Sequence, residues 1–327
     1  MPNPILASRV ATWMMRRLYR YSHPRAMRHN QALWPLVKVR RDQRGRLVEC
    51  VIRGVSPSPA LADLDLEPRH PGQTAHLILS GPSVAEIDYD RLTLDYVMGV
   101  NGSIALQARH PNLRFDYYAI LDTGFMDKRR HLVDQILAQD LLLLCTPEVV
   151  KWIALRIPPR RIGCRLGVFE EVHQRALCPR PTPQALAAQL AGDPDLVLFD
   201  AYRPVHAHGY SLDVRRGLFG GGTVAYSALQ FLTWLGFSRI YVHGLDLKDA
   251  HNRPRFYETD KDKAGTALTR QFASHIEPAF RDAGALLRSR GVQVYNLSLD
   301  SALGEDVFPK LDWRTLAAPR ETGSPAA

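Results

Sequence analysis

The strongest structural signal in this sequence is the stretch 76–83, HLILSGPS, in which a short apolar run meets a turn of small residues. An apolar run bounded by Gly and Pro is typical of a buried strand. Gly81 permits a tight turn and Pro82 suits the first turn of a helix. Ser83 and Glu86 match a capping box. The stretch therefore predicts a strand followed by a helix N-terminus, which is an anion site suited to phosphate.

The same alternation continues along the chain. Further apolar runs lie at 95–100, 116–121, 141–145, 196–199, 239–243 and 292–295. Helical periodicity is clearest at 125–138, 182–191, 222–235 and 267–290. This order predicts an α/β, Rossmann-like fold, with an open, mostly parallel sheet and helices on both faces. Ligands of such sheets bind beyond the carboxyl ends of the strands, so residues just after each run are candidates for a site.

Polar residues follow several of these predicted strands. Asn101-Gly102 offers groups suited to a ribose or a base edge, although the same residues make ordinary turns. Asp122 places a carboxylate at the same rim. Gly220-Gly221-Gly222-Thr223 precedes a helix, so its backbone N–H groups are available to a ligand. The polar loop 246–258 is typical of a site for an anionic, polyhydroxylated ligand, or of a solvated surface loop.

The basic charge is concentrated at the N-terminus. The chain has 327 residues and a net charge of +9, and residues 1–50 hold 11 Lys and Arg against 2 acids. Pro4 to Tyr21 predicts an amphipathic helix with Trp and Tyr at its apolar edge. Such a helix suits an anionic membrane surface, although it also suits packing on the protein's own core. No recognisable motif for nucleic acid accompanies the charge, so we expect no nucleic-acid partner.

The organisation predicted along the chain has three parts. Residues 1–70 comprise the basic helix, a β-hairpin around 36–52 and a Pro-rich linker. Residues 71–315 form the α/β domain, and 316–327 a disordered tail. No apolar run approaches the roughly 20 residues of a spanning helix, and the N-terminus lacks a secretory signal. The four cysteines are scattered and lack CxxC spacing, which argues against a disulfide framework and against a zinc site. They favour a reducing compartment.

These motifs resemble a known family, the Z-type lipopolysaccharide core biosynthesis Kdo (3-deoxy-manno-octulosonate) transferases, within the clan of bacterial CMP-sialic-acid transferases. The resemblance covers about residues 75–313. Its matching positions are Val100-Asn101-Gly102-Ser103, Asp122, Arg129-Arg130, Gly209-Tyr210, Thr223, Gly244-Leu245-Asp246-Leu247, Arg255-Phe256-Tyr257, Asn296-Leu297-Ser298, Asp300 and Pro309. Where the sialyltransferases carry Thr-Ser-Gly, this chain has Thr223-Val224-Ala225, and no residue aligns securely with their catalytic His.

The resemblance implies a CMP-activated eight- or nine-carbon keto-acid sugar as donor, a lipid-linked oligosaccharide acceptor, and no essential metal or other cofactor. It implies a cytoplasmic protein peripheral to the inner membrane. The implied nucleotide contacts are Ser80, Gly81, Pro82, Ser83, Asn101, Gly102, Asp122, Gly222 and Thr223. Lys248, Arg255 and Tyr257 are expected to bind the donor phosphate or carboxylate. His251 is the first candidate for the general base, followed by Asp246 and Glu258.

Two other functions remain open on the sequence alone. A diphosphokinase acting on a small heterocycle would also use the Gly-Pro-Ser loop and Asp122, but with ATP and Mg²⁺. A non-catalytic subunit that recruits a partner to the membrane would use the basic helix and would bind a nucleotide without turnover. Magnesium dependence and the effect of Arg255→Ala distinguish these alternatives from the transferase.

Overall fold

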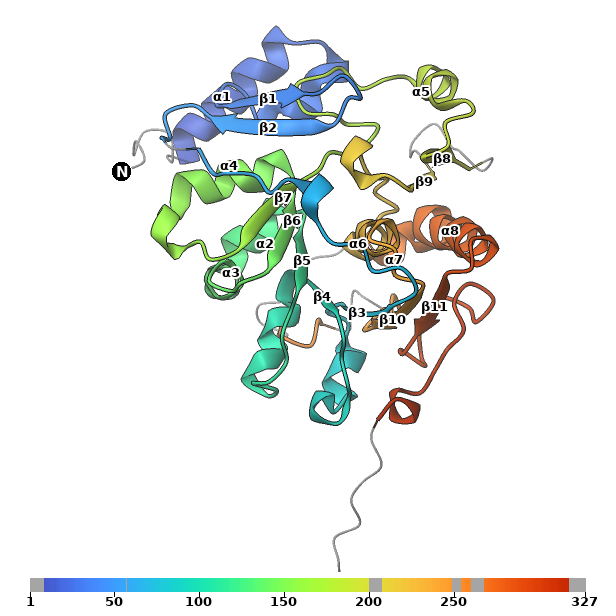
Figure 1. Ribbon diagram of the computed structural model, residues 1–327. Helices are drawn as coiled ribbons and strands as arrows, with labels where there is room; N and C mark the ends of the chain where they lie inside the picture. Colours follow the sequence, from blue (N-terminus) through green and yellow to red (C-terminus); the bar gives the residue numbers. More distant parts are fainter. Residues whose placement is uncertain (1–8, 57, 200–207, 249–253, 260–267, 318–327) are drawn as a thin grey trace, which may run out of the picture.

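A computed structural model describes residues 9–56, 58–199, 208–248, 254–259 and 268–317 (Figure 1). Its centre is a seven-stranded parallel sheet in the order β11-β10-β3-β4-β5-β6-β7. The strands of this sheet are β3 (Thr74–Ile78), β4 (Val97–Val100), β5 (Tyr117–Ile120), β6 (Leu142–Cys145), β7 (Arg165–Val168), β10 (Arg239–His243) and β11 (Gln293–Asn296). The structure thus confirms the α/β, Rossmann-like fold predicted from the sequence.

Helices cover both faces of the sheet (Figure 1). The described α-helices are α1 (Arg9–Ser22), α2 (Thr123–Lys128), α3 (Arg130–Leu137), α4 (Pro147–Arg156), α5 (Pro183–Leu190), α6 (Val224–Trp234), α7 (Leu268–Gln271) and α8 (Glu277–Ser289). Alternate strand residues point to opposite faces. Leu77 and Tyr117 therefore join one core with α6 and α8. Ile78 and Tyr118 join a second core with α3 and α4. Burial on both faces explains why the strands read as continuous apolar runs.

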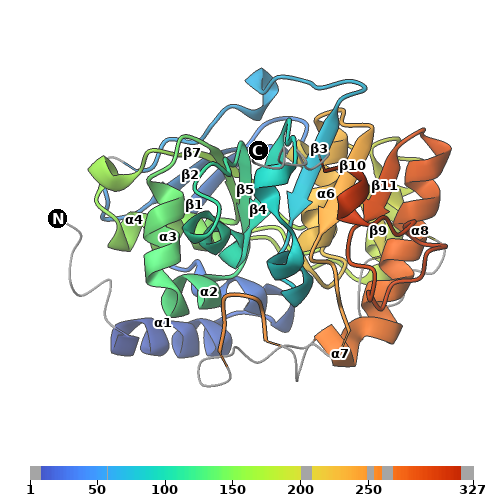
Figure 2. The ribbon, with the colours of Figure 1, turned by 90° about the horizontal axis from the view of Figure 1, so that it is seen from below.

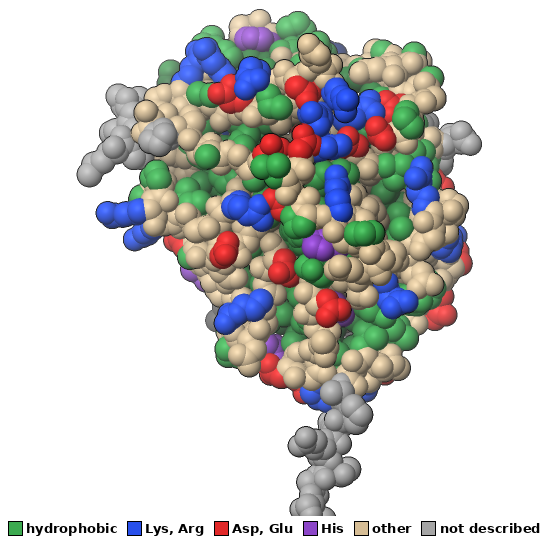
Figure 3. All heavy atoms as spheres, in the orientation of Figure 1, with side chains coloured by type: hydrophobic (Ala, Val, Ile, Leu, Met, Phe, Trp, Pro, Cys, Tyr) green, Lys and Arg blue, Asp and Glu red, His purple; other side chains and the backbone are tan. Residues whose placement is uncertain are grey.

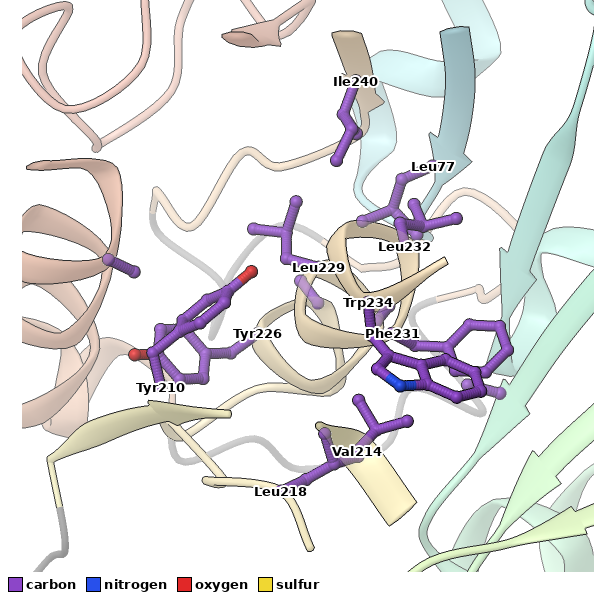
Figure 4. Close-up of a cluster of buried hydrophobic side chains, with 14 of the residues drawn as sticks. Leu77, Tyr210, Val214, Leu218, Tyr226, Leu229, Phe231, Leu232, Trp234 and Ile240 are labelled. Atoms are coloured by element: carbon purple, nitrogen blue, oxygen red, sulfur yellow. The ribbon is translucent and has the colours of Figure 1, made fainter. Parts of the chain in front are cut away.

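Helix α6 is buried on several sides (Figure 4). Leu232 packs towards the sheet residue Leu77, and Tyr226 lies edge-on to Tyr210 at 5.8 Å between ring centroids. Tyr210 belongs to β9 (Gly209–Ser211), which pairs antiparallel with β8 (Leu196–Leu198). This packing places the N-terminus of α6 near the carboxyl ends of the central strands.

The N-terminal segment packs directly against the α/β domain. It contains α1, the 3-10 helix Arg25–Ala32 and the hairpin β1 (Val37–Arg41) and β2 (Leu47–Ile52), which was predicted from the sequence. Hairpin residues belong to the same core as α3 and α4. Arg41 forms an ion pair of 2.5 Å with Glu170, whose side chain is 6% exposed. The segment is thus anchored through both apolar and charged contacts.

Two local predictions are wrong. The run 196–199 contributes β8 to the small sheet with β9, while the unpredicted β7 takes the edge of the main sheet. The sequence of β7, Arg-Leu-Gly-Val, is too short and too interrupted to read as an apolar run. The capping box is also absent: Pro82–Glu86 is one 3-10 turn with no side-chain cap. The Ser83 hydroxyl instead pairs with that of Ser298 at 2.8 Å.

The ends of the chain extend beyond the described residues. Most of the predicted tail 316–327 and the first residues of the predicted N-terminal helix lie outside them. Among the helices that the structure describes, none combines the length and apolar character that crossing a membrane requires.

Candidate active site

A cavity of about 370 Å³ opens at the carboxyl ends of the central strands. From β3 the chain proceeds through β4, β5, β6 and β7 in one direction across the sheet. It then returns to place β10 on the other side of β3. This reversal is a topological switch point, where open α/β sheets bind their ligands. Eleven predicted site residues line the cavity: Ser80, Gly81, Pro82, Asn101, Asp122, Gly222, Thr223, Asp246, Lys248, Arg255 and Glu258.

The loops after β3 and β10 interlock at the base of this cavity. A Cβ atom on Gly81 would lie 2.2 Å from Asp246 Oδ2 and 2.4 Å from the carbonyl oxygen of Gly244, so only glycine fits there. Asp246 is buried and accepts a hydrogen bond of 3.1 Å from the backbone N–H of Ser83. Asp246 therefore supports the Gly-Pro-Ser loop while remaining part of the cavity wall.

Asn101 carries the clearest sign of a ligand site. Its backbone φ is 47°, in the left-handed region that residues other than glycine seldom adopt. Its side-chain Oδ1 is buried and has no hydrogen-bond partner. Buried polar atoms are nearly always paired, and local strain clusters at functional sites. Leu247, on the opposite side of the switch point, also has a left-handed φ of 54° and lines the same cavity.

The N-terminus of α6 points into the cavity. Thr223 caps the helix by accepting a hydrogen bond of 3.2 Å from the N–H of Tyr226. Gly222 has φ of 78° and lines the cavity together with Val224 and Ala225. The first backbone N–H groups of a helix lack intrahelical partners, and the helix dipole adds positive potential. This arrangement suits a phosphate or carboxylate group of a ligand.

The segment 254–259 closes one side of the cavity through an ion pair. Arg255 Nη1 lies 3.0 Å from Glu258 Oε1, and Arg129 Nη2 lies 3.7 Å from the same oxygen. The side chain of Glu258 is only 3% exposed. The guanidinium expected to meet the donor is therefore engaged by a carboxylate in this state. Lys248 similarly pairs with Asp300 at 2.5 Å, at a more exposed position.

Three predicted contact residues support the cavity from behind its wall. A Cβ on Gly102 would lie 2.0 Å from the ring of Tyr257, so any larger residue at position 102 would clash with that ring. Burial raises the pKa of Tyr257 to about 12, and its side chain hydrogen-bonds with Ser80. Ser83 forms hydrogen bonds with Asp246 and Ser298, as described above. Gly102, Tyr257 and Ser83 are not among the residues that line the cavity.

Other sequence expectations fall outside the cavity or outside the described residues. His251 lies in the range 249–253, which the structure does not describe, so its role as a base stays a prediction. His243 is fully buried, and its Nε2 lies 3.0 Å from Nδ1 of His76. Sequence reasoning missed Leu268 and Gln271 of α7, which line the cavity from a short helix with no distinguishing motif.

Fold and cavity together define an open parallel α/β protein with a cavity at its switch point. Residues 197–314 match the family described as "3-deoxy-D-manno-octulosonic acid transferase WaaZ". A relative from Escherichia coli (strain K12), described as "Probable 3-deoxy-manno-octulosonic acid transferase", is 31% identical over 110 residues. These residues are 34% of this chain and 37% of that relative, so the alignment spans little more than a third of its length.

A second relative, from Salmonella typhimurium (strain LT2) and with the same description, is 23% identical over 267 residues. These make up 75% of this chain and 89% of that relative. A MAf glycosyltransferase from Magnetospirillum magneticum AMB-1 aligns with a TM-score of 0.43 and 12% identity, over 76% of this chain and 35% of that structure. The family match at residues 197–314 and the two relatives make the chain WaaZ-like, which confirms the resemblance drawn from its motifs. The likeness to CMP-sialic-acid transferases stays a prediction.

Proposed function

We propose that this protein is a glycosyltransferase of lipopolysaccharide core biosynthesis. In this proposal it moves a Kdo-like ulosonic acid from a CMP-activated donor to a lipid-linked core oligosaccharide. The similarity to proteins described as Kdo transferases supports the reaction class. The single structural observation that carries the proposal is Asn101. Its amide oxygen is buried and unpaired, and the residue lines a cavity that also holds a helix N-terminus, which supports a site for a polar group and an anion side by side.

Transfer from a CMP-sugar sets three chemical tasks. The acceptor hydroxyl oxygen bonds to the anomeric carbon, while the bond from that carbon to the phosphate oxygen of CMP breaks. The leaving CMP keeps the electron pair of the broken bond, and the acceptor proton passes to a base. The site must therefore hold the phosphate, stabilise the oxocarbenium-like centre and accept the proton.

The phosphate task falls to the N-terminus of α6 and to the two cations of the neighbouring loop. Val224 and Ala225 present backbone N–H groups, which need no counter-ion. Arg255 reaches a phosphate or a sugar carboxylate once the ligand replaces Glu258 as its partner. Lys248 makes the same exchange with Asp300. In the free protein these pairs keep both cations neutralised until an anionic donor enters.

We propose that the general base is one of the three residues predicted from the sequence, His251, Asp246 or Glu258. Asp246 is the best placed of the described candidates because it lines the cavity next to the Gly-Pro-Ser loop. Glu258 is already committed to two guanidinium groups. His251 keeps its place as the first histidine to test. We expect no metal requirement, because the helix N-terminus and the cations supply the positive charge that the leaving phosphate needs.

The acceptor is proposed to reach the site from a membrane surface. Helix α1 turns an apolar face to solvent: Trp13, Met14 and Leu18 are each 59% exposed and Tyr21 is 81% exposed. Arginines flank this face, a composition that suits an anionic lipid interface. Figure 2 shows α1 and α7 at the end of the molecule toward which β3 points. Burial raises the pKa of Glu148 on α4, and the charges of Arg16 on α1 and of the cavity residue Asp122 both act on it, lowering and raising that pKa respectively.

Calorimetric titration with CMP, UDP, ADP and ATP, with and without Mg²⁺, tests the donor proposal. We expect selective CMP binding that is unchanged by EDTA and is lost in Asn101→Ala. A preference for ATP with Mg²⁺ would instead identify a diphosphokinase. Incubation with CMP-Kdo and core lipopolysaccharide then tests transfer, and binding without turnover would identify a recruiting subunit.

A further inference from the structure

A second hollow, the arginine pocket, lies on the N-terminal segment. It has a volume of about 380 Å³ and is lined by Arg25, Arg28, His29, Gln31, Gln174 and Arg180. Four of these residues come from the 3-10 helix Arg25–Ala32, and the other two come from the loop that follows β7. Three guanidinium groups thus converge from segments 150 residues apart, and none of the lining residues is acidic.

The two segments are fixed to one another by backbone and amide hydrogen bonds. The N–H of Arg180 donates to the carbonyl oxygen of Ala26 at 2.8 Å. Buried Asn30 donates to the carbonyl oxygen of Cys178 at 3.0 Å and accepts from the N–H of Leu177 at 2.8 Å. The spacing of the arginine pocket is therefore set by the fold before any ligand arrives. A preorganised site binds with a smaller entropic cost.

Among the described residues the arginine pocket keeps an excess of positive charge: the charge of Arg180 acts on the carboxylate of Glu171, without an ion pair between them. Within the described residues, Arg25, Arg28 and Arg180 form no ion pair within 4 Å. Arginines elsewhere around the hairpin do: Arg215 pairs with Asp213, and Arg216 with Asp193. Figure 3 shows basic and acidic side chains intermingled on the upper part of the molecule, where Figure 1 places the hairpin. Burial, aided by the charge of Arg180, lowers the pKa of His29, so the field of the pocket acts on its own members.

A short path of contacts connects the arginine pocket with the candidate active site. Gln174 donates a hydrogen bond of 3.0 Å to Glu171. Glu171 Oε1 lies 3.0 Å from the position of a Cβ on Gly220, which begins the glycine loop of the cavity. Gln174 and Glu171 therefore link the arginine pocket to the loop that borders the donor cavity. The same N-terminal segment carries the exposed apolar face of α1.

We propose that the arginine pocket binds a phosphate group carried by the saccharide acceptor. The proposal rests on the proposed function for the nature of that acceptor. Guanidinium groups bind phosphate with paired, charge-assisted hydrogen bonds, and three of them around one hollow match its charge. The pocket positions the acceptor beside the donor cavity, while α1 holds the lipid portion. It thereby selects phosphorylated over unphosphorylated saccharide.

Equilibrium binding of a soluble, deacylated core oligosaccharide to the full chain tests this assignment. The oligosaccharide is used before and after enzymatic dephosphorylation, with Arg25→Gln/Arg28→Gln and Arg180→Gln as variants. We expect at least about a tenfold loss of affinity for the phosphorylated form in each variant. We expect no change for the dephosphorylated form. The control is Arg160→Gln/Arg161→Gln, which removes two exposed arginines that precede β7, whereas Gln174 and Arg180 of the arginine pocket follow that strand.

The outcomes separate the possible sources of phosphate and the two proposals. Equal losses in the control and the pocket variants would refute the site, because only net charge would then matter. Lost binding to phosphatidylglycerol vesicles, with unchanged binding of the soluble oligosaccharide, would assign the pocket to lipid headgroups and overturn the proposal. CMP titration of the same variants should be unchanged. Failure of CMP-Kdo turnover in the wild-type chain would refute the proposed function without affecting this binding measurement.

Discussion

Replacing Asn101 with glycine should stabilise the protein and weaken nucleotide binding at the same time. Two features of Asn101 oppose folding: a left-handed backbone with φ of 47° and a buried amide oxygen without a partner. Both features are expected of a residue that binds a ligand. Asn101→Gly removes both features, so stability and affinity should change in opposite directions.

The magnitude follows from the two costs. A non-glycine residue in the left-handed region costs about 1 kcal/mol, and a buried unpaired polar group costs about 1–3 kcal/mol. Glycine offsets part of this gain, because it adds about 1 kcal/mol of chain entropy to the unfolded state. We therefore expect the free energy of unfolding to rise by about 1–3 kcal/mol. The affinity for CMP should fall at least about tenfold with the loss of a ligand hydrogen bond.

Urea unfolding followed by circular dichroism, together with calorimetric CMP titration, checks both halves. The matched control is Asn101→Ala, which removes the amide but keeps the left-handed strain, so its stability should fall below that of Asn101→Gly. A destabilised Asn101→Gly variant would show that the amide supports the fold. Unchanged CMP affinity would show that the amide does not contact the nucleotide, and would refute the reasoning for the site.

Three further predictions concern stability. Burial lowers the pKa of His76 to about 4, so the unfolded chain binds more protons between about pH 6.5 and 4. As the pH is lowered through this range, the free energy of unfolding should fall by up to roughly 1.4 kcal/mol per pH unit, and the slope should be smaller in His76→Gln. Arg41→Met should cost about 3 kcal/mol by leaving buried Glu170 unpaired, while exposed Arg40→Met costs under about 1, both measured in urea. Thr223→Ala should cost about 1 kcal/mol in melting experiments by removing the α6 cap.

The parallel sheet could be predicted because strands buried on both faces must be apolar throughout. The runs around Leu77, Met98, Tyr118 and Leu143 all lie in the central sheet for this reason. The edge strand β7 was missed although three of its four residues are buried, because Gly167 separates its two apolar residues, Leu166 and Val168. The other edge strand, β11, has a longer apolar pattern and was predicted at 292–295.

The composition of the candidate site could also be anticipated, since polar and glycine-rich residues follow the strands at one rim. Gly81, Asn101 and Thr223 line the cavity as that rule requires. The neutralisation of Arg255 by Glu258 could not be predicted, because an i, i+3 pair in a loop has no fixed geometry. The support that Tyr257 receives from Gly102 joins residues 155 positions apart, and no local pattern relates them.

The sequence by itself determined the alternation of strands and helices, the rim that carries the site and the basic character of the N-terminus, because these follow from local periodicity and charge. Tertiary structure alone placed β10 beside β3 and so created the cavity at their switch point. It alone brought Arg180 to Arg25 and Arg28, and turned the apolar face of α1 to solvent. The physical reason is that non-local contacts depend on how whole elements pack, and a one-dimensional pattern does not encode the distance between them.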